Sequence, residues 1–239
     1  MYNQIKVEIY KLRNSKFFYV SIIGFLTMSV MIFHANVFRD GLDITGYEAF
    51  IYSISDTSLL FITSLFVSYF IGNDFANRTI DNEIRIGYSR ISVILSRVIV
   101  ALPFAALLYL FYSVPRAVLT GLVNGFGGEM AVQDVLIRIV LFTFQIMAVT
   151  SFTALIMFWC KKSSLGMMIS VCFTVVTCNI LRGFSGGNPI FRATSFYRIQ
   201  MNHEIMTSQD IVFSFVSAIV NIIAVLFAAY LVFRKAELK

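Results

Sequence analysis

Charged residues and cysteines are scarce in this sequence, and both shortages restrict the class of protein. Charged side chains make up 13% of the 239 residues, against roughly 25% in an average soluble domain. This composition excludes a soluble globular enzyme and a highly charged disordered chain. Cys172 and Cys178 lie in an apolar run and Cys160 lies beside Lys161, so the cysteines indicate no disulfide framework of a small secreted protein.

Motifs that carry catalytic or nucleotide chemistry are also missing. The two histidines, His34 and His203, form no HExxH pair, and no pair of intramembrane aspartates suggests an active site. No GxxxxGK(S/T) segment occurs, so the sequence contains no P-loop for ATP. We therefore expect no enzyme activity, metal site or cofactor on this chain. The formal net charge of +6 has to be interpreted by membrane topology, and no nucleic acid is expected as a partner.

Apolar side chains are abundant. Hydrophobic residues account for 58% of the chain and phenylalanine occurs 25 times, which gives a mean hydropathy of +0.80. A helix needs about 20 mostly apolar residues to cross a bilayer. Six runs meet or approach this length. They predict an all-α integral membrane protein with a single transmembrane domain over residues 1–239 and spans at about 17–38, 50–71, 91–112, 136–159, 165–181 and 211–233.

The distribution of Lys and Arg predicts the orientation of these spans. With the N-terminus in the cytoplasm, every lysine lies on the inner side, and the inner segments hold more than twice as many Lys and Arg residues as the outer segments. Basic residues concentrate on the cytoplasmic side of membrane proteins. We therefore expect a multi-pass protein of a bacterial plasma membrane with both termini in the cytoplasm.

The N-terminal segment, residues 1–15, is patterned like a helix. Tyr2, Ile5, Ile9 and Leu12 share one helical face, while the basic side chains point elsewhere. The pattern predicts an amphipathic helix that lies in the inner membrane interface and leads into the first span. The alternative is an ordinary positively charged flank that only sets topology.

The inner loop between the second and third spans, residues 73–90, also predicts a short helix. It opens with the capping residue Asn73 and closes near Gly87. Its charges are mixed in sign, which suits docking to a protein better than docking to anionic lipid. A solvated connecting helix would have the same features and is the alternative interpretation.

In layout the sequence resembles the ABC-2 type permeases over its whole length. In that family the inner loop carries an acidic residue, then Gly-Thr, an apolar stretch and Pro-x-Ser-Arg at the start of the third span. The residues similar to this pattern are Asp74, Arg78-Thr79, Ile80, Ile84 and Tyr88-Ser89-Arg90. Arg78 replaces the usual Gly, and Gly87 stands where Pro is common. The Glu8–Lys11 pair before the first span also resembles the family's N-terminal pattern.

The resemblance implies partners and a function. A dimer of separate ATP-binding subunits would carry ATP and Mg²⁺, and a second permease copy, identical or related, would complete the transporter in the lipid membrane. Residues 73–87 would be a cytoplasmic coupling helix that docks on the ATPase. The resemblance assigns ATPase coupling to Asp74, Phe75, Arg78, Thr79, Ile80, Asp81, Glu83, Ile84, Arg85 and Arg90. The short chain is similar to permeases that export, or give immunity to, antimicrobial peptides such as lantibiotics.

Polar residues inside the predicted spans are candidate functional residues because they are costly to place in a bilayer. His34, Asp56 and Arg138 all enter spans from the outer side, which predicts one buried cluster with a structural role or a gating role. Arg97 lies near an inner span end, where it is expected to snorkel to water. Gln145, Asn179 and Asn221 suit hydrogen bonds between helices better than a transport path. The apolar outer segment, residues 182–210, is expected to fold back onto the membrane surface or to form an ordinary amphipathic loop.

The preferred function is therefore a permease subunit of an ATP-driven exporter for an amphipathic or hydrophobic substrate, with a peptide favoured. Two alternatives remain from the sequence. An ion-gradient-driven secondary transporter is less favoured because the chain shows no inverted repeat and no second broken helix to match Pro103. A membrane adaptor or sensor without transport activity is the other alternative.

Overall fold

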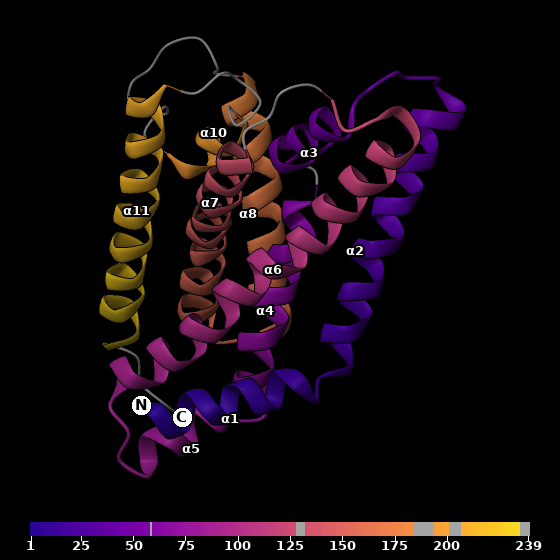
Figure 1. Ribbon diagram of the computed structural model, residues 1–239. Coiled ribbons are helices and arrows are strands. Elements are labelled where there is room, and N and C mark those ends of the chain that lie inside the picture. The colour runs from indigo at the N-terminus through magenta and orange to yellow at the C-terminus, as the bar shows by residue number, and fades with distance from the viewer. Residues whose placement is uncertain (58, 128–131, 184–193, 201–206, 235–239) are drawn as a thin grey trace.

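A computed structural model describes residues 1–57, 59–127, 132–183, 194–200 and 207–234, and this part of the chain is helical with no strand (Figure 1). The helices are α1 (Tyr2–Arg13), α2 (Lys16–His34), its π-helical extension η1 (Ala35–Arg39), α3 (Gly46–Ser55), α4 (Leu60–Ala76), α5 (Thr79–Arg85), α6 (Arg90–Asn124), α7 (Val132–Cys160), α8 (Ser163–Gly183), α10 (Ser195–Gln200) and α11 (Ser208–Arg234). The predicted all-α membrane architecture is confirmed.

Five of these helices are long and apolar enough to cross a membrane: α2 with η1, α6, α7, α8 and α11. A sixth span exists if α3 and α4 are counted together, although they meet at a bend of 54°. The predicted second span, 50–71, overlaps both α3 and α4. α3 ends at Ser55, and the backbone of Asp56, which follows it, is extended. Polar side chains such as Ser55, Asp56 and Thr57 compete for backbone hydrogen bonds and disfavour a helix interior.

The third span is much longer than its apolar run predicted. α6 continues from Arg90 to Asn124, about 52 Å at the rise of an α-helix, and it contains Pro103 and Pro115. This exceeds the roughly 30 Å hydrocarbon core of a bilayer. At its far end α6 meets α3, where the backbone N–H groups of Gly46 and Tyr47 donate to the carbonyls of Gly125 and Phe126.

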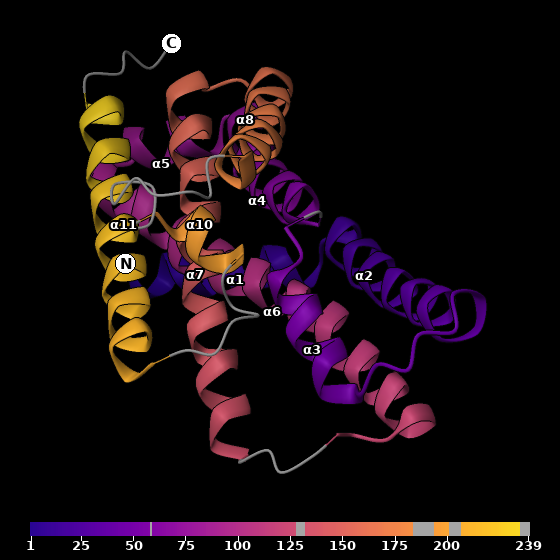
Figure 2. The ribbon, with the colours of Figure 1, turned by 90° about the horizontal axis from the view of Figure 1, so that it is seen from above.

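Helix packing forms one bundle around a continuous apolar core. Seen from above, α7 lies between α11 on one side and α3 with α6 on the other, and α2 lies beyond α6 (Figure 2). Phe25 of α2 packs on Tyr109 of α6 with ring centroids 6.0 Å apart. Ser64 of α4 and Thr174 of α8 share a buried hydrogen bond of 2.8 Å, which joins two helices that sequence periodicity cannot pair.

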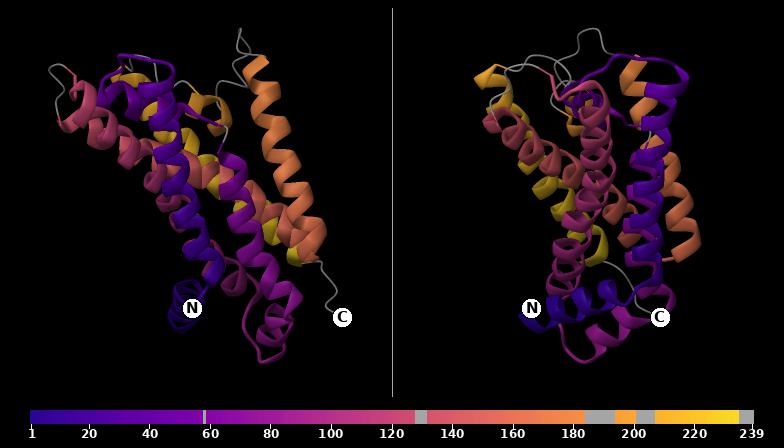
Figure 3. Two further views of the ribbon diagram at one scale, coloured as in Figure 1. Left: turned by 90° about the vertical axis from the view of Figure 1, so that its right-hand side faces the viewer. Right: turned by 45° about the vertical axis from the view of Figure 1, so that its right-hand side comes forward.

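Two short helices lie at one end of the bundle, which we call the α5 end. α1 crosses this end at a steep angle to α2, α5 lies below it, and the last turn of α11 reaches the same end (Figures 1 and 3). The buried face of α1 carries Gln4, Glu8 and Leu12, whereas Tyr2 and Tyr10 are exposed. The buried face of α1 therefore includes two polar side chains, Gln4 and Glu8, whereas Asn3, Lys6 and Arg13 are exposed.

The loop between α4 and α5 is folded tightly. The predicted helix over 73–87 starts later than expected, because residues 73–76 form the last turn of α4 and α5 begins at Thr79. Arg78 joins the two helices with φ +56°, a left-handed conformation that favours glycine. The need for this conformation explains why a glycine suits this position. α5 ends at Arg85, two residues before Gly87, and the N–H groups of Gly87 and Tyr88 donate to the carbonyls of Ile84 and Glu83.

Candidate functional site

A buried cluster of five ionisable side chains joins four helices at the α5 end. Its members, which we call the Arg97 network, are Glu8 and Lys11 of α1, Asp74 of α4, Glu83 of α5 and Arg97 of α6. Each comes from the end of its helix that faces this corner, so the turn at Arg78 and the crossing of α1 bring together residues that are far apart in the sequence.

Arg97 is the centre of the network. Its Nε donates to Asp74 Oδ2 at 2.7 Å, and its Nη2 and Nη1 donate to the two carboxylate oxygens of Glu83 at 2.8 and 3.0 Å. Arg97 Nη2 also lies 3.6 Å from Glu8 Oε1. The planar guanidinium supplies several donors in fixed directions, so a lysine could not hold both carboxylates in this way.

Lys11 closes the network on the side of α1. Its Nζ donates to Glu8 Oε1 at 2.9 Å and to Asp74 Oδ1 at 3.0 Å. Gln4 extends the contact, because its Nε2 lies 3.5 Å from Glu83 Oε2 and its Oε1 accepts a hydrogen bond from Ser92 Oγ of α6. These polar contacts tie three helices, α1, α4 and α5, to α6.

Arg97, Glu8 and Asp74 are shielded from solvent, whereas the side chains of Glu83 and Lys11 expose 16% and 31% of their surface. The Arg97 side chain has no exposed surface, in contrast to the expected snorkelling, because three carboxylates satisfy its charge inside the protein. Burying a charge is costly unless it is paired, and removing one partner of a buried pair costs about 3–5 kcal/mol. The cluster therefore holds α1, α4, α5 and α6 in one specific arrangement.

The network contains three acidic and two basic side chains, and the excess of negative charge affects the pKa of Glu8. Burial raises the pKa of the Glu8 carboxyl, and the negative charge of Asp74 raises it further, against the opposing influence of Arg97 and Lys11. Glu8 Oε2 has no hydrogen-bond partner within the described residues. A proton on this oxygen would therefore break no contact of the network.

The outward face of the α4–α5 loop has a different character. Arg78, Asn82, Arg85 and Gly87 are exposed, and the side chains of Ile86 and Tyr88 expose 78% and 43% of their surface. We call Arg78, Asn82, Arg85, Ile86 and Tyr88 the loop face. An exposed isoleucine and tyrosine among polar residues form the kind of surface that another protein covers.

Most of the residues assigned to ATPase coupling from the sequence hold the loop in place instead of facing outward. Asp74 and Glu83 bind Arg97, and Ile80 is fully buried while Ile84 packs against the core. Phe75 packs on Phe158 and Phe233, with centroids 5.8 and 6.4 Å apart. Arg90 Nη1 donates to the carbonyls of Phe233 and Arg234 at 2.7 and 2.9 Å and so caps α11.

The remaining four residues assigned to coupling lie nearer the surface. Arg78 and Arg85 are on the loop face, Asp81 is half-buried, and Thr79 lines a cavity beside α1. Sequence reasoning missed Ile86 and Tyr88. The sequence pattern that indicates them is a pair of large side chains, one on each side of Gly87, in an otherwise polar loop.

His34, Asp56 and Arg138, for which the sequence predicts one buried cluster, have different neighbours in the structure. His34 lies at the end of α2 with its ring 5.5 Å from that of Phe38, and Arg138 lies in the first turns of α7. Asp56 follows α3, where its Oδ2 accepts a hydrogen bond of 3.4 Å from Tyr112. Asp56 thus belongs to a cluster that the sequence did not reveal.

That second cluster centres on Arg116, which the sequence placed in an outer loop. α6 extends through this position, and Arg116 is only 6% exposed. Its Nη1 donates to the Tyr112 hydroxyl at 3.0 Å and to Ser53 Oγ at 3.1 Å. These contacts fasten α3 to α6 at the end of the bundle opposite α5.

The three residues expected to form hydrogen bonds between helices lie in different helices: Gln145 in α7, Asn179 in α8 and Asn221 in α11. Asn221 Nδ2 donates to Ser217 of its own helix at 2.7 Å and lies 3.4 Å from Ser195 Oγ of α10, so it joins α11 to α10. Asn179 donates to Val175 of its own helix at 2.8 Å. Gln145 is fully buried in α7. Part of the outer segment, residues 182–210, lies outside the described residues.

Known proteins confirm the class of molecule. Residues 4–180, which run from α1 to α8 and include the whole Arg97 network, match the family model described as ABC-2 family transporter protein. No curated protein matches the chain. Within the described residues, no group of three His, Cys, Asp or Glu side chains could hold a metal ion. The chain belongs to the ABC-2 family of transporter proteins, and it is a membrane permease of an ABC exporter.

Proposed function

We propose that the loop face is the surface on which a separate ATP-binding subunit docks, and that the Arg97 network transmits its motion to the spans. The exposed Ile86 and Tyr88 beside Arg85, on a loop whose opposite side is fixed by buried ion pairs, support this proposal. Under this assignment the α5 end lies in the cytoplasm, as the distribution of lysines predicts.

The geometry supports a mechanism. Closure of an ATPase dimer around ATP would push α5 sideways or upward. Because Glu83 is bound to Arg97 of α6, and Arg97 is bound to Asp74 of α4, a displacement of α5 moves both helices together. A short, tightly capped helix transfers force better than a flexible loop. The bend between α3 and α4 provides a hinge at which such a motion can change the opposite end.

The preferred substrate is an amphipathic or hydrophobic molecule, and a peptide remains the favoured class. A groove of about 480 Å³ between α3, α6 and α7 supports this preference, because apolar side chains such as Phe50, Val118 and Ile139 dominate its lining. The groove lies at the end opposite α5, where an exported molecule would leave. We further propose that two permease copies assemble to match two ATPase subunits, as a homodimer or with a related permease.

Substitutions on the loop face test the docking proposal. Arg85→Glu with Ile86→Asp should abolish copurification of the ATPase encoded beside this gene and the ATP-dependent export that it drives, because the change places two carboxylates on the docking surface. Glu83 is unsuitable for this purpose, since reversing its charge would break the Arg97 network. The control variant is Lys6→Glu, an exposed position on α1 at the same end.

Two measurements decide the result. Pull-down should recover the ATPase with the control and lose it with the loop variant, while both variants keep the elution volume of the unchanged permease. Undiminished recovery of the ATPase by the folded loop variant would disprove docking on this surface. Export that continues on an ion gradient without ATP would support the secondary transporter instead.

A further inference from the structure

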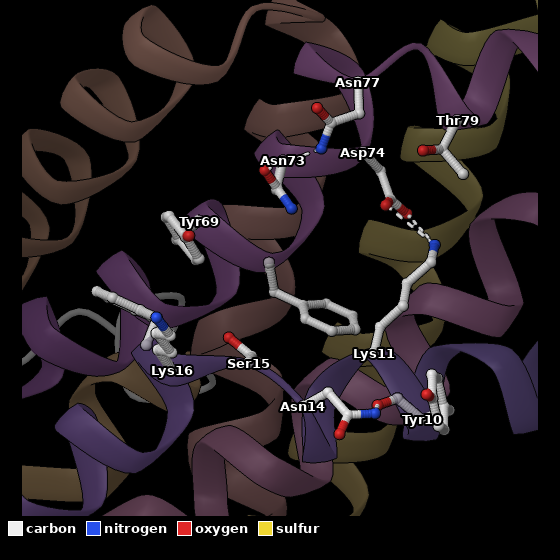
Figure 4. A pocket seen from close by; sticks show the side chains of 12 residues that line it. Tyr10, Lys11, Asn14, Ser15, Lys16, Tyr69, Asn73, Asp74, Asn77 and Thr79 are labelled. Carbon is white, nitrogen blue, oxygen red and sulfur yellow. Dashed lines mark hydrogen bonds and ion pairs between the residues drawn. The ribbon is translucent and has the colours of Figure 1, made fainter.

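A polar cavity of about 550 Å³ lies at the corner where α1 meets α2, and α4 and α5 form its other walls (Figure 4). Lys11, Asn14 and Lys16 line it from the side of α1 and α2, and Asn73 and Asn77 line it from the side of α4. Its size lies within the range of pockets that hold small ligands. The docking and transport proposals do not use this cavity.

The lining favours an anion. Asp74 reaches the cavity, but both of its oxygens are already bound, by Arg97 at 2.7 Å and Lys11 at 3.0 Å. Lys16 is exposed and forms no ion pair with an acidic side chain of the described chain. Its charge stands at the first residue of α2, where the helix dipole adds to the positive potential.

The cavity wall also carries neutral side-chain amides, of which Asn14 Nδ2 already donates to the carbonyl of Tyr10 at 3.0 Å. Asn77 Nδ2 donates to Asn73 Oδ1 at 3.1 Å, which turns the amide nitrogen of Asn73 toward the cavity (Figure 4). The amides and hydroxyls of the wall can therefore donate several hydrogen bonds to the oxygen atoms of one ligand group. A phosphate, with its strong acceptor oxygens, fits this set of donors.

The position of the cavity indicates where the phosphate comes from. Its floor is aromatic: Phe17 and Tyr69 have ring centroids 4.2 Å apart, and Phe70 lies beside them. Phe17 is the second residue of the first span, so polar rim and apolar floor meet where α2 enters the membrane. A soluble phosphate would use only the rim, whereas a phospholipid would use both.

We propose that this cavity binds an anionic phospholipid, with the phosphate group on Lys16 and the side-chain amides and the start of an acyl chain on Phe17 and Phe70. The bound lipid would touch α1, α2, α4 and α5 at once. It would therefore reinforce the joint that the Arg97 network makes, and the permease would retain this lipid through purification.

Native mass spectrometry of the detergent-purified permease tests the proposal, with phosphatidylglycerol as the probe and phosphatidylcholine, a zwitterion with no net charge, as the comparison. One lysine near a bilayer contributes about fivefold to the attraction of anionic lipid. Lys16→Gln should therefore reduce bound phosphatidylglycerol by about fivefold or more. Lys6→Gln removes the same charge from the exposed side of α1 and should leave binding nearly unchanged.

A second variant keeps every charge and fills the space. Asn73→Trp should also displace phosphatidylglycerol, while its melting temperature in phosphatidylcholine stays near that of the unchanged protein. Equal losses from Lys16→Gln and Lys6→Gln would overturn the proposal, because they would show general surface attraction. Competition by millimolar inorganic phosphate that empties the site equally well would also overturn it in favour of a soluble phosphate ligand.

Discussion

At the residue scale, the fold raises the pKa of the Glu8 carboxyl, chiefly through burial. Glu8 occupies the crowded acidic side of the Arg97 network, with Asp74 nearby and one oxygen without a partner. Its pKa is raised, so the folded protein binds a proton at Glu8 more tightly than the unfolded chain does. The stability that this proton contributes is complete below the ordinary glutamate pKa of about 4.3 and is lost as the pH rises through the raised value.

Glu8→Gln removes this titration while keeping the size of the side chain. The melting temperature of Glu8→Gln relative to the unchanged permease should therefore increase as the pH rises from about 4 and become constant above the raised pKa. Melting curves of both proteins in one detergent between pH 4 and 8 measure the difference. Parallel curves, or a difference that falls with pH, would contradict the assignment.

The residues of the Arg97 network show what a sequence can and cannot predict at this scale. The Glu8–Lys11 pair was visible because the two residues lie three apart on one helix. Asp74 and Arg97 are 23 residues apart, and their contact depends on the left-handed turn at Arg78. An arginine near a span end suggests snorkelling when its partners are unknown. Only the packing of α5 under α6 shows that carboxylates surround it.

At the element scale, close approach of α3 and α6 fixes the end of the bundle opposite α5. A Cβ atom added to Gly46 would lie 2.7 Å from Cα of Gly121 and 2.8 Å from the carbonyl oxygen of Ala117. These obstacles are backbone atoms, so they cannot rotate away. Gly121 and Gly125 are four residues apart, a spacing typical of closely packed helices, but the sequence does not identify the partner helix.

Gly46→Ala should therefore destabilise the permease by about 1–3 kcal/mol, because the two helices must separate. Gly24→Ala is the matched control in α2, where an added Cβ meets nothing within 4 Å. That change should be neutral or raise stability by up to about 1 kcal/mol. Thermal unfolding in detergent distinguishes the two, and equal melting temperatures would show that α3 and α6 are not tightly packed here.

The helices themselves were largely predictable, because length and apolar composition decide which segments cross a membrane. The boundaries were less predictable where polar residues interrupt a run. Ser55, Asp56 and Thr57 divide the second span, although their apolar neighbours suggested continuity. Arg116 lies beyond the predicted third span, 91–112, whereas in the structure α6 continues past it and Arg116 donates to Tyr112 and Ser53 inside the bundle.

At the scale of the whole molecule, the two ends of the bundle have different surfaces. The α5 end combines an exposed loop face with a buried ionic joint, and the opposite end carries an apolar groove between α3, α6 and α7. Under the proposed function, a motor at the α5 end would act on a substrate at the other end through the spans between them. The family match is consistent with this division, since such permeases normally work with an ATP-binding subunit.

Site-specific photo-crosslinking in cells tests the central proposal most directly. A photoreactive amino acid at Ile86, on the loop face, should crosslink to the ATP-binding subunit. The same amino acid at Leu122, an equally apolar position that is 70% exposed near the other end of α6, should not. Crosslinking of the ATPase from position 122, or none from position 86 when the complex assembles, would contradict the proposed docking.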